Sequence, residues 1–157
     1  MNIILYVVGK TDDNYLNEGT DKYFKRIKHY INFDLQIIKD IKNTKNITED
    51  IQKKLEGEKI LAGITNSDII VLLDEKGKEL NSREFSGFLT KQMNSGIKNL
   101  VFIIGGPYGF SEQVYERANH KISLSKMTFS HQIIRLIFAE QLYRAFTIIN
   151  NEPYHHD

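Results

Sequence analysis

The fold class of this chain is decided by residues Leu100–Gly109, which read LVFIIGGPYG. Five consecutive apolar residues, Leu100–Ile104, are typical of a strand buried on both faces of a mainly parallel sheet. Glycines directly after such a strand let a ligand approach the backbone, and open α/β sheets bind ligands at this edge. The segment therefore predicts a ligand site at Gly105. It lacks the G-x-G-x-x-G dinucleotide fingerprint, and it would also suit a tight turn into a helix.

Further apolar runs on both sides of this segment predict the rest of the sheet. They are Ile3–Val8, Leu35–Ile38, Ile69–Leu73 and a shorter strand around Ile122–Leu124. Helical periodicity between them places buried faces at Tyr15, Gly19, Tyr23, Ile27 and Tyr30; at Ile47, Ile51, Leu55 and Ala62; and at Phe85, Phe88, Leu89 and Met93. Asn81–Glu84 resembles a capping box at a helix start. We predict a single-domain α/β fold over residues 1–157, an open mainly parallel sheet with helices on both faces.

A long helix from about His131 to Asn150 is apolar around its whole circumference. A surface helix keeps a polar face, so this helix must be covered on two sides. In so small a domain the sheet covers only one side. We therefore expect a homodimer with two-fold symmetry, whose interface includes Phe138, Leu142 or Phe146.

The composition is that of an ordinary globular protein, with 41% hydrophobic and 26% charged residues. The absence of cysteine excludes disulfides and thiolate metal sites. Because 21 basic residues face 20 acidic ones, no long-range field attracts nucleic acid, and RNA would need a local or dimer-composite surface. No signal-peptide pattern and no membrane-length apolar run occur, so we expect a cytoplasmic protein that does not bind membranes.

Polar residues in the last third of the chain are the candidates for chemistry. Leu124–His131 is a polar loop between a strand and a helix, and a capped connection would also explain it. His131 and Arg135 are four residues apart, as are Glu140 and Arg144, and such pairs are often surface ion pairs or polar first-turn residues. An arginine in an apolar helix nevertheless needs a partner or a ligand, because burying its charge alone is costly.

The end of the chain, Glu152–Asp157, carries aromatic and imidazole groups where a frayed polar terminus is usual. His155, His156 and Asp157 are types of metal ligand. Adjacent ligands at a terminus are a poor basis for a metal site, and we expect no metal.

Five segments together carry a specific resemblance. They are Leu72–Lys78, Phe102–Gly109, Leu124–His131, Glu140–Ala145 and Pro153–His155. In order and spacing they resemble the bacterial 23S ribosomal RNA pseudouridine N3-methyltransferases of the knotted SPOUT class (RlmH type). The resemblance covers the whole chain, including its length.

The resemblance implies a C-terminal trefoil knot in a cofactor-binding part of about residues 70–157, an obligate homodimer, and S-adenosyl-L-methionine as the cofactor. It implies methylation at N3 of a pseudouridine, position 1915, in a stem-loop of the large-subunit RNA of the ribosome. Carried over by motif, the cofactor contacts fall on Leu73, Gly105, Leu124, Ser125, Lys126, Met127, Thr128 and Phe129. The catalytic and RNA-facing side, completed by the dimer, falls on His131, Arg144, Tyr154 and His155.

The residue types suit this chemistry. Methyl transfer from a sulfonium needs no metal, so the protein aligns the reactants and stabilises the uracil ring as N3 loses its proton. Arginine can stabilise the negative ring, and a histidine or a water molecule can accept the proton.

Two positions depart from the family pattern. Ser130 stands where the family usually has proline, and serine caps a helix well. His156 stands where the family usually has a basic residue, which bears on contact with RNA phosphate. Two alternatives remain open at this level: a knotted methyltransferase with another nucleotide target, and a non-catalytic ribosome-binding or assembly module. The intact Gly105 and Gly106 argue against a degenerate cofactor pocket.

Overall fold

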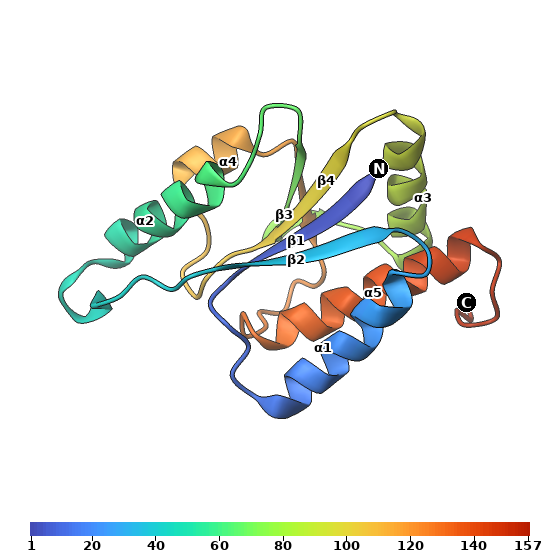
Figure 1. Ribbon diagram of the computed structural model, residues 1–157, viewed down its shortest axis with the longest axis horizontal. Coiled ribbons are helices and arrows are strands. Elements are labelled where there is room, and N and C mark those ends of the chain that lie inside the picture. The colour runs from blue at the N-terminus through green and yellow to red at the C-terminus, as the bar shows by residue number, and fades with distance from the viewer.

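The computed structural model describes every residue from Met1 to Asp157 and is built around one parallel sheet (Figure 1). Its strands are β1 (Asn2–Val8), β2 (Asn32–Ile38), β3 (Ile69–Glu79), β4 (Asn99–Ile104) and β5 (His120–Ser123). They lie in the order β2-β1-β4-β3-β5, and every neighbouring pair is parallel. The predicted α/β class with an open parallel sheet is confirmed.

Helices cover both faces of the sheet, as predicted. They are α1 (Asn14–Ile27), α2 (Glu49–Ala62), α3 (Ser82–Asn94), α4 (Glu112–Arg117) and α5 (Ile133–Ile149), with a short 3-10 turn, Thr44–Asn46, before α2. Helices α1, α5 and α3 lie on one face, whereas α2 and α4 lie together on the other (Figure 1). The capping box that starts α3 at Asn81 is present. None of the helices combines the length and apolarity that crossing a membrane requires.

The central strands are buried on both faces because their side chains alternate between two apolar layers. In β4, Leu100 and Phe102 pack toward α1, α3 and α5, while Val101 and Ile103 pack toward α2 and α4. Removing such side chains from water stabilises the fold by about 25 cal/mol per Å² of apolar surface. Two-sided burial therefore explains the run of apolar residues without polar alternation.

Strand β3 is longer than the apolar run that predicted it, and it is irregular near the carboxyl edge. Strand β5 pairs with Val71–Leu73 before the irregularity and with Lys78–Glu79 after it. A β-carbon on Gly77 would stand 2.7 Å from the backbone of Ile122, so glycine is needed for this close approach. Residues 74–77 therefore leave the β3–β5 ladder and pass close against β5.

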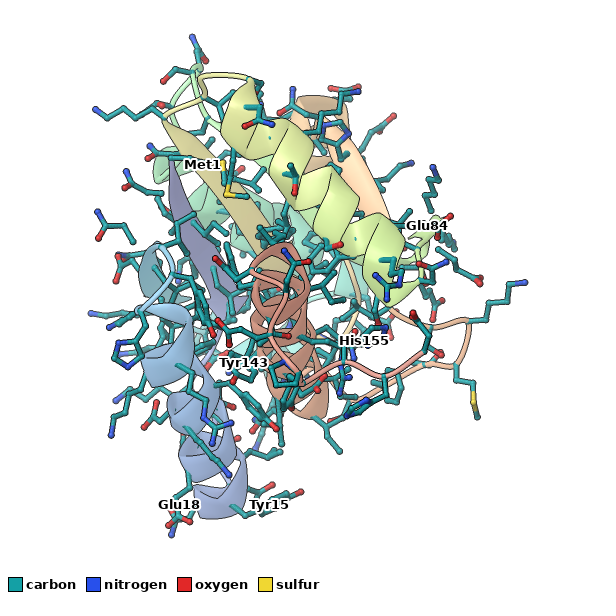
Figure 2. All side chains as sticks on the ribbon, turned by 90° about the vertical axis from the view of Figure 1, so that its right-hand side faces the viewer. Met1, Tyr15, Glu18, Glu84, Tyr143 and His155 are labelled. Atoms are coloured by element: carbon teal, nitrogen blue, oxygen red, sulfur yellow. The ribbon has the colours of Figure 1, made fainter.

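The predicted buried face of α1 is wrong by one position for most of its length. The buried residues are Leu16, Thr20, Phe24 and Ile27, of which only Ile27 was expected. Tyr15 is 64% exposed and lies at the outer end of α1 (Figure 2). Tyr23 and Tyr30 are half-buried beside the helix, because their rings pack against Tyr143 of α5.

The predicted buried face of α2 is also wrong. Its buried residues are Glu56, Gly57 and Ile60, whereas Ile51 and Ala62 are exposed. The reason is close packing: a β-carbon on Gly57 would lie 2.3 Å from Ser111 Oγ, so small and polar positions face inward here. The expected face of α3, by contrast, packs against the core as predicted.

The proposed dimer residues on α5 are corrected by the structure. Phe138, Leu142 and Phe146 are 0%, 0% and 2% exposed, because they form part of the chain's own core. The sheet covers one side of α5, and α1 and α3 flank it, so the chain itself accounts for most of the apolar circumference (Figure 1). A dimer interface on α5 would have to use its outer side, where Ile133 is 36% exposed and Ile137 half-buried.

Candidate active site

A cavity of about 350 Å³ opens at the carboxyl ends of β3 and β4. Its walls are Leu73–Lys76, Ile104–Phe110 and the loop after β5, with Tyr115 and His131 at its sides. The volume lies within the range of roughly 300–1,000 Å³ that is typical of small-molecule sites. The position is also the one at which open parallel sheets bind ligands.

The structure gathers around this cavity all but one of the residues that the family resemblance assigns to the cofactor. Those that line it are Leu73, Gly105, Leu124, Ser125, Met127, Thr128 and Phe129. The exception is Lys126, whose ammonium group lies on the outside of the loop, 3.6 Å from the carboxylate of Glu79. An exposed ion pair of this kind contributes little to stability, so Lys126 has no evident role in shaping the cavity wall.

Hydrogen bonds fix the loop after β5 against residues 74–77 of β3, the segment that leaves the β3–β5 ladder and is called the β3 excursion below. Thr128 Oγ1 donates to Glu75 Oε2 at 2.7 Å. Ser125 Oγ accepts a hydrogen bond from the backbone N–H of Met127 at 2.9 Å, and Ser123 Oγ donates to the carbonyl of Ser125 at 2.9 Å. A polar loop that satisfies its own backbone groups can expose apolar side chains to a ligand at little cost.

The two glycines after β4 pack closely against neighbouring side chains, Gly105 against a ring of the cavity wall and Gly106 against a buried carboxyl group. A β-carbon on Gly105 would stand 3.1 Å from the ring of Phe110, and one on Gly106 would stand 2.7 Å from Glu56 Oε2. Gly109 has a φ of 81°, in the left-handed region, and closes the turn by donating to the Gly106 carbonyl at 3.1 Å. The loop is thus packed against Phe110 of the cavity wall and supported from behind by Glu56.

Sequence reasoning missed several residues of the cavity wall. Asp74 and Tyr115 both line it, and the Tyr115 hydroxyl donates to Asp74. Burial, and then this hydrogen bond, raise the pKa of Tyr115, so the phenol stays protonated and keeps donating. The signal for Asp74 and Glu75 was their place directly after an apolar strand, whereas one tyrosine on the short helix α4 carries no sequence signal.

His131 is the only predicted catalytic residue that lines the cavity. Burial, and next the neighbouring Arg135, lower the pKa of His131, against smaller opposing effects of Asp40 and Asp12. A lowered pKa keeps the imidazole neutral at pH 7, so one ring nitrogen is free to accept a proton.

Arg135, by contrast, is a structural residue. It is 2% exposed and donates to the carbonyls of Val8 at 2.5 Å, Gly9 at 2.9 Å and His131 at 3.1 Å, and to Thr11 Oγ1 at 3.0 Å. These acceptors answer the question of how a buried arginine is satisfied. Arg135 joins the end of β1 to the start of α5.

Arg144, Tyr154 and His155 form a second group, on α5 and the tail that folds back along it. Arg144 Nη2 lies 2.5 Å from Glu140 Oε1, and the guanidinium is 4.8 Å from the centre of the Tyr154 ring. Tyr154 donates to the same Glu140 oxygen at 3.1 Å, and Arg144 Nη1 lies 3.3 Å from His155 Nδ1. Figure 2 shows His155 on this tail, below the end of α3 that carries Glu84.

The tail has its own anchor, which bears on the metal question. His155 Nε2 pairs with Asp157 at 3.0 Å, and Asp157 pairs with Arg83 of α3. Because His155 Nδ1 accepts from Arg144, the Nε2–H tautomer satisfies both contacts. No group of three or more histidine, aspartate or glutamate side chains is arranged to hold a metal ion.

The predicted catalytic residues therefore do not meet within one chain. None of Arg144, Tyr154 and His155 lines the cavity beside His131. Arg144 lies about three turns along α5 from its first residues, a separation of roughly 15 Å at 1.5 Å per residue.

The fold and the cavity define an α/β protein with a cavity of small-molecule size at the carboxyl edge of its parallel sheet. A solved structure with the same fold is that of a probable methyltransferase from Bordetella pertussis Tohama I. It is 12% identical, covers 92% of this chain and 95% of its own, and superposes with a TM-score of 0.52. At this identity the likeness concerns the fold alone.

The chain belongs to the SPOUT methyltransferase family, whose family model, described as "Predicted SPOUT methyltransferase", matches residues 1–155. Similar proteins include the ribosomal RNA large subunit methyltransferase H of Christiangramia forsetii, 60% identical over 99% of both chains. The protein of that name from Flavobacterium psychrophilum is 61% identical over 99% of both chains, and that from Parabacteroides distasonis is 59% identical over 100%. The resemblance stated from the sequence motifs is thereby confirmed.

Proposed function

We propose that this protein transfers a methyl group from S-adenosyl-L-methionine to N3 of a pseudouridine, position 1915, in the 23S RNA of the large ribosomal subunit. The observation that carries the proposal is the cavity at the carboxyl edge, lined by Gly105 and the loop after β5, in a chain about 60% identical along its whole length to large-subunit RNA methyltransferases. The cavity is the evidence for cofactor binding, and the names of the relatives are the evidence for an RNA substrate.

The cavity residues fit S-adenosyl-L-methionine by shape and charge. Gly105 and Gly106 offer exposed backbone, and Leu73, Leu124 and Phe129 offer apolar surface for a purine and an alkyl chain. Asp74 and Glu75 supply negative charge near a cofactor that carries a sulfonium and an ammonium group. When bound, the cofactor supplies an electrophilic methyl group.

The chain's own residues then have two tasks, which are to accept one proton from the base and to stabilise the negative charge that this leaves on the ring. N3 must lose its proton to become nucleophilic, and His131, which burial keeps neutral, is the proposed acceptor. The negative charge spreads over the ring oxygens, where Arg144 is the proposed stabilising group. Burial first, and then Tyr23 and Glu140, raise the pKa of Tyr154, so its hydroxyl stays protonated at neutral pH, keeps donating to Glu140 and holds the tail in place for contact with RNA.

The separation of His131 from Arg144 supports a composite site in a homodimer. A second copy related by a two-fold axis would bring its Arg144, Tyr154 and His155 to the cavity of the first. We propose that this dimer, with a cofactor-binding knot within residues 70–157, acts on ribosomal particles in the cytoplasm. The family to which the chain belongs, whose model matches residues 1–155, supports a threaded chain in that part.

The test is methyl incorporation measured in parallel on whole ribosomes, free large subunits and naked large-subunit RNA from cells that lack this enzyme. Mass spectrometry of the digested RNA should place the methyl group on a single pseudouridine and at N3. Methyl groups on another nucleotide would support the alternative of a knotted methyltransferase with a different target.

A third outcome separates the enzyme from a binding module. S-adenosylhomocysteine should raise the melting temperature, because a ligand that binds only the folded state stabilises it. Particle binding without a thermal shift and without methyl transfer would favour a ribosome-assembly factor and would contradict the proposal.

A further inference from the structure

A second hollow lies on the far side of the β3 excursion, between α3 and the edge strand β5. Its volume is about 680 Å³. Its cationic side chains are Lys76, Lys78, Lys91 and Lys121, with His120 beside them, and the only carboxylate on its wall is Glu84. In a chain with 21 basic and 20 acidic residues, such an excess of one sign is a local feature.

The positive charge of this hollow is not neutralised from within. No carboxylate lies within 4 Å of any of the four lysine ammonium groups. The ammonium of Lys121 lies 5.5 Å from the centre of the Tyr115 ring on α4, so the lysines that belong to the α3 side of the hollow are Lys76, Lys78 and Lys91. Glu84 is already engaged, because its Oε2 accepts from the backbone N–H of Asn81 in the capping box. Burial, and then Lys91, lower the pKa of His120, as expected where a positive field opposes a further positive charge.

The hollow adjoins the cofactor cavity directly. Lys76 lines both, from the excursion that separates them. Gly77 fixes this wall in place, because its backbone is in contact with Ile122 of β5 and leaves no room for a side chain. If the target base of an RNA strand enters the cavity, the neighbouring phosphates of that RNA would therefore pass close to these lysines.

A simpler explanation covers only part of the observation. Edge strands often carry lysine, which prevents pairing with another sheet, and this would account for Lys121 on β5. It does not account for Lys91 on α3 or Lys76 on the excursion, neither of which lies at the open edge of β5. The convergence of Lys76 and Lys78 from β3 with Lys91 from α3 points to a ligand.

We infer that this hollow is a docking groove for RNA phosphates, which holds the substrate strand beside the cofactor cavity. The inference rests on the proposed function for the identity of the RNA. Lysines on the strand β3 and on the helix α3, with Lys121 at the sheet edge, suit a bent or looped RNA backbone, since each ammonium contacts phosphate as a point charge without reading a base. The groove thus supplies affinity for the RNA and positions it on the protein, and the cavity selects the base that is methylated.

The experiment uses the triple variant Lys78→Ala, Lys91→Ala, Lys121→Ala, which leaves Lys76 of the cavity wall intact. The matched control is Lys42→Ala, Lys45→Ala, Lys54→Ala, which removes equal charge from exposed positions at and before α2, on the opposite face. The probe is large ribosomal subunits from cells without the enzyme. A thermal shift with S-adenosylhomocysteine first verifies that each variant is folded and binds the cofactor.

The groove variant should raise KM for large subunits at least about tenfold with kcat within about twofold of wild type. Its slope of log affinity against log salt should be shallower by about 2, because each lost phosphate contact removes roughly 0.7–0.9. The control variant should leave both KM and the salt slope close to their wild-type values. Equal effects of both variants, or a fall in kcat with unchanged KM, would overturn the groove.

These outcomes are separable from failure of the proposed function. Wild-type protein that binds large subunits through the groove but transfers no methyl group would contradict the proposed methyltransferase activity and support the groove. Methyl transfer by the groove variant with wild-type KM and salt slope would support the methyltransferase activity and contradict the groove. Wild-type protein that binds no large-subunit RNA would overturn both.

Discussion

Gly106 and Glu56 are in such close contact that a β-carbon on Gly106 would lie 2.7 Å from Glu56 Oε2. Glu56 is 3% exposed, its Oε1 accepts from Gln52, and its Oε2 has no hydrogen-bond partner. A carboxyl group in this position supports the cofactor loop from behind, and it does so most cheaply when it is uncharged. The contact therefore links the ionisation of the Glu56 carboxyl group on α2 to the shape of the cavity.

Replacing Glu56 with glutamine should stabilise the protein increasingly as the pH rises. Burial is the main reason that the pKa of Glu56 is raised. The folded state then keeps a proton that the unfolded state releases above about pH 4, so wild-type stability is lost as the pH rises through the raised pKa. Glu56→Gln lacks this loss, and urea unfolding between pH 4 and pH 9 should show the gap widen and then level off. The exposed neighbour Glu58→Gln is the control, and a pH-independent gap would contradict the assignment.

Gly105→Val should abolish cofactor binding while the protein remains folded. The first side-chain atom would already stand 3.1 Å from the Phe110 ring, which lines the cavity, so valine must displace either this ring or the loop at the cavity wall. Calorimetry with S-adenosyl-L-methionine should show at least about a hundredfold loss of affinity, equivalent to roughly 2.7 kcal/mol. The control is Gly87→Val, at a position with open space around it. Wild-type affinity in a folded Gly105→Val protein would place the cofactor elsewhere.

Arg135→Met should destabilise the fold by about 2–4 kcal/mol, because it leaves buried carbonyls without a donor. The carbonyls concerned are those of Val8 and Gly9 at the end of β1. Urea denaturation measures the effect, and Lys25→Met on the exposed side of α1 is the control. A change below about 0.5 kcal/mol, the usual range for surface substitutions, would show that the buried arginine has no structural role.

The strands could be predicted because two-sided burial leaves an unmistakable run of apolar residues, as in Leu100–Ile104. The helix faces were less certain, since periodicity cannot show which small or polar residues face inward. On α2, close packing against Ser111 selects Gly57, and the loop at Gly106 selects Glu56, while Ile51 remains outside. The apolar circumference of α5 was recognised correctly, but its cover comes mainly from within the chain.

The site shows the same division between local and long-range information. Motifs identified the loop Leu124–Phe129 and Gly105, which are contiguous in sequence and lie together at one sheet edge. Tyr115 was missed because its role depends on a contact with Asp74 across 41 positions of the chain. No periodicity or spacing encodes such a contact, so only the fold reveals it.

The dimer interface can now be tested with neighbouring residues on opposite sides of α5. Phe138→Asp should prevent folding, because Phe138 is fully buried in the chain's own core. Ile137→Asp, on the half-buried outer side, should give a folded monomer by sedimentation if that side forms the proposed interface. The melting transition distinguishes the two results. A folded Ile137→Asp protein that remains dimeric at micromolar concentration would exclude this side of the helix.

The catalytic assignment depends most on Arg144 and the tail that packs on it. Arg144 spans Glu140, Tyr154 and His155, and hydrogen bonding to Glu140 raises its pKa, so it is a fixed positive charge. Groups of this kind, set in place for a developing charge, typically contribute roughly 3–4 kcal/mol, or about 10²–10³ in rate. Arg144→Ala, and separately a truncation before Tyr154, should reduce methyl transfer to large-subunit particles at least about tenfold.

Cofactor affinity should change little in both variants, because neither residue lines the cavity. The exposed cation Lys22→Ala serves as the control for lost charge. Mixed dimers then decide which chain acts: if Arg144 serves its partner's cavity, pairing Arg144→Ala with Gly105→Val leaves one intact composite site, and activity should return to about half of wild type. If Arg144 serves its own cavity, that mixed dimer keeps one site impaired in cofactor binding and one impaired in catalysis, and activity stays low. Near-wild-type turnover by the Arg144→Ala homodimer would mean that the negative ring is stabilised elsewhere, even with the cofactor site intact.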